Sequence, residues 1–108
     1  MIPLPAPIRT YFTVQTPQEG AALAAAFAPD ATVEDEGARH HGPEAIRQWW
    51  LAAKAKYRHS AEPLDLLEED GKTVVRARVS GEFPGSPVVL RFRFGLTGDR
   101  IRDLRIGG

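Results

Sequence analysis

The sequence predicts an α+β protein in which three N-terminal helices pack against a curved antiparallel sheet. Apolar residues recur at helical spacing in three segments before residue 58. From Pro63 onward they instead alternate with charged residues, at the two-residue period of strands. Helices gathered on one face of an antiparallel sheet are typical of the α+β class. Because 108 residues suffice for one hydrophobic core, we expect a single domain over residues 1–108.

Sequence signals mark the first two helices. Pro7 is suited to the first turn of a helix that Pro17 stops, because proline fixes φ and lacks an amide hydrogen. Thr16 and Glu19 match a capping box for a second, alanine-rich helix, which we expect to run to Phe27.

A short strand, Thr32–Glu34, is expected next, followed by a polar loop from Gly37 to Gly42. Pro43 is placed to open a third helix. The apolar face of that helix consists of Ile46, Trp49, Trp50, Ala53 and Tyr57.

The C-terminal half is expected to form an antiparallel meander. Asp70–Gly71 is typical of a two-residue hairpin turn between the first two strands after Pro63. Val88–Leu96 alternates most clearly, and Ile101–Ile106 is predicted as the last strand.

Composition excludes several classes of protein. Fourteen basic residues balance fourteen acidic ones, so no overall charge favours nucleic acid or an anionic membrane. The chain has no cysteine, which rules out disulfides and thiolate metal sites. No apolar segment approaches the roughly 20 residues that span a bilayer. We therefore expect a cytoplasmic protein with no metal or other cofactor, no nucleic-acid partner and no membrane association.

Three segments resemble the nuclear-transport-factor-2-like superfamily, including its SnoaL-like (polyketide-cyclase-like) branch. They are Phe27–Asp35 (FAPDATVED), His41–Trp49 (HGPEAIRQW) and Phe92–Phe94 (FRF), the last followed by Ile101 and Leu104. The resemblance covers nearly the whole chain and implies a cystatin-like, cone-shaped sheet around the helices. It implies little about function, because this fold hosts isomerases, dehydratases, cyclases, epoxide hydrolases and non-catalytic subunits.

Within the superfamily, residues 31–35 are most similar to the ketosteroid isomerases, whose catalytic base ends the matching strand. The resemblance implies Asp35 as the base and Tyr11 as a hydrogen-bond donor to the developing oxyanion. A second donor, a protonated aspartate, is expected two residues before the Phe-Arg-Phe element, where this chain has Leu90. The resemblance therefore implies proton transfer on a small hydrophobic carbonyl compound, by an isomerase- or cyclase-like enzyme. The alternative is a non-catalytic, small-molecule-binding homodimer with a degenerate site.

Both candidate catalytic residues have a simpler interpretation. Asp35 lies in the acidic run 34–36, and such runs are usually solvated. Tyr11 shares a helix face with Ile8, and a core tyrosine whose hydroxyl bonds a backbone carbonyl or water is common.

His40 and His41 are further candidates for acid–base chemistry or ligand contact. Adjacent residues of a strand point to opposite sides, so at most one of them should reach a cavity. The absence of cysteine and the single well-placed carboxylate nearby argue against a metal site.

Aromatic and aliphatic side chains are expected to line an apolar pocket for a small hydrophobic molecule. The predicted ligand-binding residues are Trp49, Trp50, Leu90, Phe92 and Phe94.

Arginines alternate with apolar residues on the predicted strands. No aromatic residues lie between the arginines on the same face, which argues against a nucleic-acid-binding surface. We expect these arginines to face water, or acidic residues of a second subunit in a homodimer formed through the sheet face. Asp103, whose neighbours are Arg102 and Arg105, is interpreted as a member of a surface ion pair, although some SnoaL-like cyclases place an acid on this strand.

Overall fold

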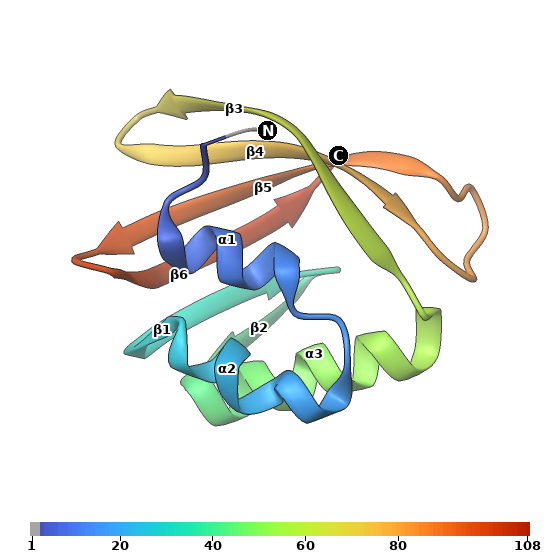
Figure 1. Ribbon diagram of the computed structural model, residues 1–108, viewed down its shortest axis with the longest axis horizontal. Helices are drawn as coiled ribbons and strands as arrows, with labels where there is room; N and C mark the ends of the chain where they lie inside the picture. The colour runs from blue at the N-terminus through green and yellow to red at the C-terminus, as the bar shows by residue number, and fades with distance from the viewer. Residues whose placement is uncertain (1–2) are drawn as a thin grey trace.

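The computed structural model describes residues 3–108 and contains three α-helices, one 3₁₀ turn and six strands (Figure 1). The helical elements are α1 (Ala6–Thr13), the 3₁₀ turn η1 (Pro17–Glu19), α2 (Gly20–Ala25) and α3 (Pro43–Tyr57). The strands are β1 (Phe27–Asp35), β2 (Ala38–His41), β3 (Ser60–Glu69), β4 (Lys72–Ser80), β5 (Val88–Thr97) and β6 (Arg100–Gly107).

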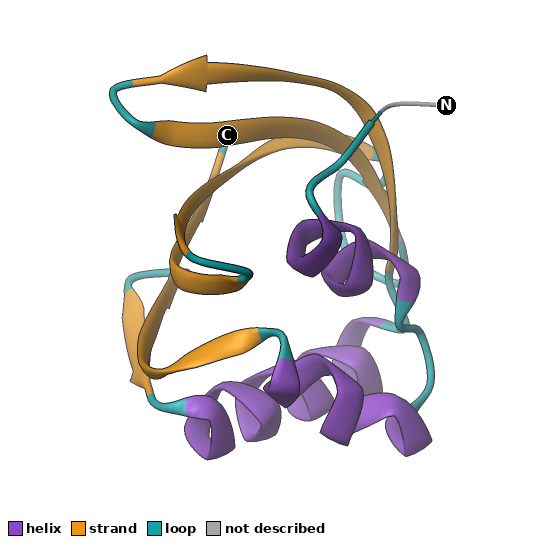
Figure 2. Cartoon of the chain, turned by 60° about the vertical axis from the view of Figure 1, so that its left-hand side comes forward, coloured by secondary structure: helices purple, strands orange, loops and turns teal. Residues whose placement is uncertain are grey.

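All six strands form one sheet in the order β2-β1-β6-β5-β4-β3. The sheet curves around α1, while α2 and α3 lie across its open side (Figure 2). This arrangement confirms the predicted α+β class and curved sheet. One pairing differs from the prediction, because β1 and β6 run parallel and the sheet is therefore mixed. The amide of Ile101 donates to the Ala26 carbonyl at 2.8 Å, at the start of this pairing.

The core lies between the concave face of the sheet and the helices. Side chains that exclude water almost completely come from α1, α2, α3, β1, β4, β5 and β6. Fully buried large residues are Ile8, Leu23, Phe27, Val33, Ile46, Val75, Phe94, Ile101 and Leu104. Burial of such side chains stabilises the fold by roughly 1.5–3 kcal/mol each, relative to exposure.

The strand ending at Asp35 is longer than predicted. Helix α2 ends at Ala25 rather than Phe27, and Pro29 and Asp30 lie inside β1. The register of β1 against β6 shifts between Phe27 and Thr32. Pro29 lies in this irregular part of the pairing, where its lack of an amide hydrogen does not interrupt the regular ladder of hydrogen bonds.

The polar loop predicted at residues 37–42 contains a strand. β2 pairs antiparallel with β1, and Asp35 lies opposite Ala38. Glu36 and Gly37 both have positive φ, of 51° and 77°, as a two-residue hairpin turn requires. The turn follows Asp35 directly, so Asp35 is the last residue of the first strand of this hairpin.

Two predicted local features are confirmed. Glu19 Oε1 accepts hydrogen bonds from the Thr16 amide at 3.0 Å and the Gln15 amide at 2.9 Å, at the start of η1. Asp70 and Gly71, with φ of 54° and 76°, form the turn between β3 and β4.

The outer face of the sheet carries ion pairs within the chain. Arg93 and Arg105 lie directly opposite each other on β5 and β6, where two like charges would repel. Arg93 bonds Glu69 at 2.6 Å and Arg105 bonds Glu34 at 2.9 Å, which offsets the repulsion. Acidic partners for these arginines are thus present without a second subunit, and the homodimer stays a prediction.

Gly81, directly after β4, allows the chain to pass close to the end of α3. A Cβ atom there would lie 2.8 Å from the Tyr57 carbonyl oxygen and 2.9 Å from the His59 Cα. These are backbone atoms and cannot rotate away. We expect Gly81→Ala to lower the free energy of unfolding by about 1–3 kcal/mol, measured by urea denaturation.

Gly107→Ala is the matched control, because no atom lies within 4 Å of a Cβ built at that position. Equal unfolding midpoints for the two variants would contradict the close approach at Gly81.

Candidate functional site

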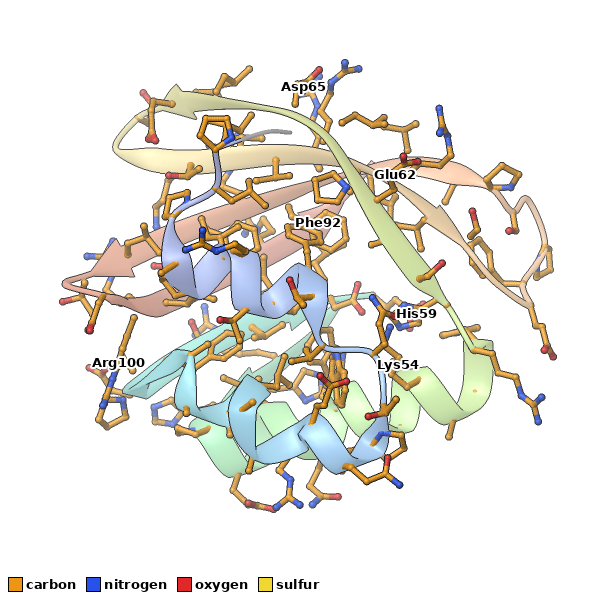
Figure 3. The ribbon with its side chains drawn as sticks, in the orientation of Figure 1. Lys54, His59, Glu62, Asp65, Phe92 and Arg100 are labelled. Atoms are coloured by element: carbon orange, nitrogen blue, oxygen red, sulfur yellow. The ribbon has the colours of Figure 1, made fainter. Side chains whose placement is uncertain are left out.

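The concave face of the sheet and the helices border a partly open cavity of about 450 Å³. α1 and α3 form one side, and β3, β4, β5 and the loop after β4 form the other. Most of its wall is apolar, including Phe12, Val14, Val79, Phe83, Leu90 and Phe92. Phe92 points from β5 toward α1 (Figure 3), where its ring centroid lies 5.1 Å from that of Phe12.

Asp35 borders this cavity at the end of β1. Its carboxylate oxygen Oδ2 accepts a hydrogen bond of 3.2 Å from Trp49 Nε1, which fixes the side chain against α3. Burial raises the pKa of Asp35, and the Trp49 hydrogen bond opposes that rise by stabilising the charged form. Asp35 also borders a second hollow of about 310 Å³, which includes Arg39 and Arg105. The carboxylate thus lies between an apolar cavity and a polar one.

Tyr11 lines the same cavity from α1 and is only 7% exposed. Its ring packs against Phe12, Phe27, Phe92 and Phe94, with centroid distances of 5.2–6.5 Å. Its hydroxyl makes no hydrogen bond to any residue from 3 to 108. Burial, followed by the charge of Asp35, raises the pKa of Tyr11, so the phenol stays protonated. A protonated, unpartnered hydroxyl can donate a hydrogen bond to a ligand oxygen.

Two further polar residues, Lys54 and His59, line the cavity near the end of α3. Lys54 Nζ donates to the His59 backbone carbonyl at 2.7 Å and to Gln15 Oε1 at 3.1 Å. Figure 3 shows Lys54 and His59 together where the chain passes from α3 to β3. Burial lowers the pKa of Lys54, and burial followed by the Lys54 charge lowers the pKa of His59 to about 4. At neutral pH His59 is therefore uncharged.

The sequence reasoning missed Lys54 and His59. A signal existed for Lys54, which lies four residues after Trp50 and so shares its helix face. The ammonium also lies 5.7 Å from the Trp50 ring centroid. His59 had no such signal, because it follows Arg58, whose left-handed conformation (φ 48°) ends α3 and redirects the chain.

Glu36 and Tyr57 also border the cavity and bond each other, with the Tyr57 hydroxyl 3.3 Å from Glu36 Oε1. This contact links the turn after β1 to the last residue of α3. Each of the two cavity carboxylates is therefore engaged by an aromatic donor of α3.

Neither predicted histidine borders the cavity. His40 is half-buried on the inner side of β2, and its ring centroid lies 5.8 Å from that of Trp49. His41 is exposed, as expected for its neighbour on the opposite side of the strand. His40 can therefore influence Asp35 through charge, but it does not face the cavity.

The predicted ligand-binding residues divide into two groups. Trp49, Trp50, Leu90 and Phe92 line the cavity. Phe94 does not, because it lies one inward position further along β5, where it is fully buried under Tyr11 and Phe12.

Asp103 bonds Lys72 at 2.7 Å and Arg102 at 3.2 Å, outside the cavity. Of the two neighbouring arginines that suggested a surface ion pair, Arg102 bonds Asp103 whereas Arg105 bonds Glu34, and Lys72 is an additional partner. Residues 3–108 contain no cluster of three or more potential metal ligands. In the same range, no helix combines the length and the apolar character needed to cross a membrane.

Known proteins resemble this chain over most of its length. The sequence profile of the SnoaL-like domain family matches residues 8–106. A provisionally assigned polyketide cyclase from Sinorhizobium meliloti is 48% identical, with a TM-score of 0.89 over 95% of this chain and 94% of its own. No curated protein sequence matches the chain.

Two further solved structures share the fold at low identity. A Catenulispora acidiphila protein with a ketosteroid isomerase-like fold, in complex with trimethylamine, is 19% identical, with a TM-score of 0.82 over 98% of this chain and 87% of its own. A provisionally assigned ketosteroid isomerase from Kribbella flavida is 14% identical, with a TM-score of 0.75 over 94% and 74%.

The Trp49 hydrogen bond makes a testable contribution to the pKa of Asp35. Trp49→Phe removes the donor that stabilises the carboxylate, so the pKa of Asp35 should rise further. The measurement is an NMR titration of the Asp35 carboxyl carbon. Trp50→Phe is the matched control, because Trp50 also lines the cavity but makes no hydrogen bond to Asp35. Equal shifts in both variants would contradict the assigned role of Trp49.

Proposed function

Because the chain belongs to the SnoaL-like domain family, we propose that it transfers a proton on a small hydrophobic carbonyl compound, as an isomerase- or cyclase-like enzyme. One observation carries this proposal. A half-buried carboxylate with a raised pKa and a buried phenol without a partner among residues 3–108 line one apolar cavity.

Asp35 is the proposed base. Its carboxylate removes a proton from the carbon next to the substrate carbonyl, and the electron pair moves onto the carbonyl oxygen to give an enolate. For a β,γ-unsaturated ketone, the protonated Asp35 then returns the proton to the γ-carbon, which yields the conjugated isomer. The raised pKa of Asp35 makes it a stronger base than a solvated aspartate.

Tyr11 is the proposed donor to the enolate oxygen. The aromatic rings around it hold the phenol in place before the substrate arrives, so little reorganisation is needed in the transition state. Leu90 lines the cavity where the resemblance places a second donor, and a leucine cannot donate a hydrogen bond. We therefore expect slower turnover than a site with two donors would give.

The absence of a second hydrogen-bond donor at Leu90 also favours a second candidate function. In this alternative the protein binds a small molecule in the same cavity without catalysing a reaction. The pKa of Asp35 discriminates between the two. A value near that of a free carboxylate, measured by NMR, would favour binding alone.

The first test is isomerisation of a β,γ-unsaturated ketone, followed by the ultraviolet absorbance of the conjugated product. We expect Asp35→Asn to lower kcat/KM by about 10²–10⁴-fold, because the general base is lost. Tyr11→Phe should lower it by about 10²–10³-fold, through loss of the oxyanion donor.

Asp99→Asn provides the control, because Asp99 is exposed in the turn between β5 and β6. It should retain the wild-type rate. If Asp35→Asn is as active as the wild type, Asp35 is not the base and the catalytic proposal fails.

A further inference from the structure

Lys54 supplies the cavity with an ammonium group that has no acidic partner. It is the one lysine or arginine among the residues that border the cavity. The two cavity carboxylates are engaged elsewhere, Asp35 by Trp49 and Glu36 by Tyr57. Within residues 3–108, no ion pair includes Lys54.

One N–H of the Lys54 ammonium has no hydrogen-bond acceptor among residues 3–108. An ammonium has three N–H donors, and two point to the His59 carbonyl and the Gln15 side chain. Both acceptors are neutral, so they orient the ammonium without cancelling its charge. The imidazole of His59 borders the same part of the cavity and is itself uncharged at neutral pH.

We infer that the ligand of this cavity is amphiphilic, with an apolar body, a carbonyl group that faces Tyr11 and Asp35, and a carboxylate that binds Lys54. This inference rests on the proposed function, since it assigns a substrate class to the same cavity. A ligand carboxylate gives the half-buried ammonium the counter-charge that the chain does not provide, in surroundings where ionic hydrogen bonds are stronger than in water.

A matched pair of probes tests the inference by isothermal titration calorimetry at neutral pH. The probes are 6-acetyl-2-naphthoate and 2,6-diacetylnaphthalene, which share an aromatic body and one ketone. They differ in that the second ketone of the neutral probe replaces the carboxylate. We expect the wild-type protein to bind the carboxylate probe at least about tenfold more tightly, the effect of one charge-assisted hydrogen bond.

Lys54→Met and Lys54→Gln should abolish this preference. The glutamine variant retains a donor for the His59 carbonyl, which guards against loss of the fold. Lys56→Met is the control, because Lys56 is exposed and does not border the cavity. It should keep the wild-type preference.

The outcomes separate this inference from the proposed function. Equal binding of the two probes by the wild type, or a preference that persists in a folded Lys54 variant, overturns the carboxylate assignment and leaves the proposed function intact. Failure of both probes to bind overturns the assignment of this cavity as a ligand site, and with it both proposals.

Discussion

The pairing of β1 with β6 is the contact on which the rest of the architecture depends. It joins the N-terminal hairpin to the C-terminal meander, and its register places Val33 beside Leu104 in the core. Helix α3 follows β2 directly, so docking of the hairpin also sets α3 across the concave face. The cavity forms where α3 and α1 face β3, β4 and β5, and Asp35 borders it because β1 ends there.

The low polarity of the cavity shifts the pKa values of its acidic and basic groups in opposite directions. Burial raises the pKa of Asp35 and lowers the pKa of Lys54, because it disfavours the charged form of each. Each shift moves the pKa of the group toward neutral pH. A pKa closer to the working pH makes both proton transfer and reversible ionic binding easier. The hydrogen bonds from Trp49 to Asp35, and from Lys54 to His59 and Gln15, orient these buried groups.

Much of the fold could be predicted because its signals are local. Prolines, the capping box and the alternation of apolar residues located the helices and most strands. The parallel contact between β1 and β6 could not be read from periodicity, since it joins segments about 70 residues apart and leaves no local pattern. Tyr11 and Asp35 line one cavity, and their catalytic roles stay a prediction. His59 escaped prediction because its position depends on the left-handed turn at Arg58, which is neither glycine nor asparagine.

The order of the strands in space also has a kinetic consequence. β6 lies far from β1 in the sequence, yet it lies between β1 and β5 in the finished sheet. The N-terminal hairpin therefore has no complete docking surface before β6 has formed, and the edge of β1 that pairs with β6 stays unpaired until then. Contacts between segments so distant in sequence slow folding, because the loop entropy is lost before the contact forms. Until β6 pairs with β1, that unpaired edge is open to pairing with other chains.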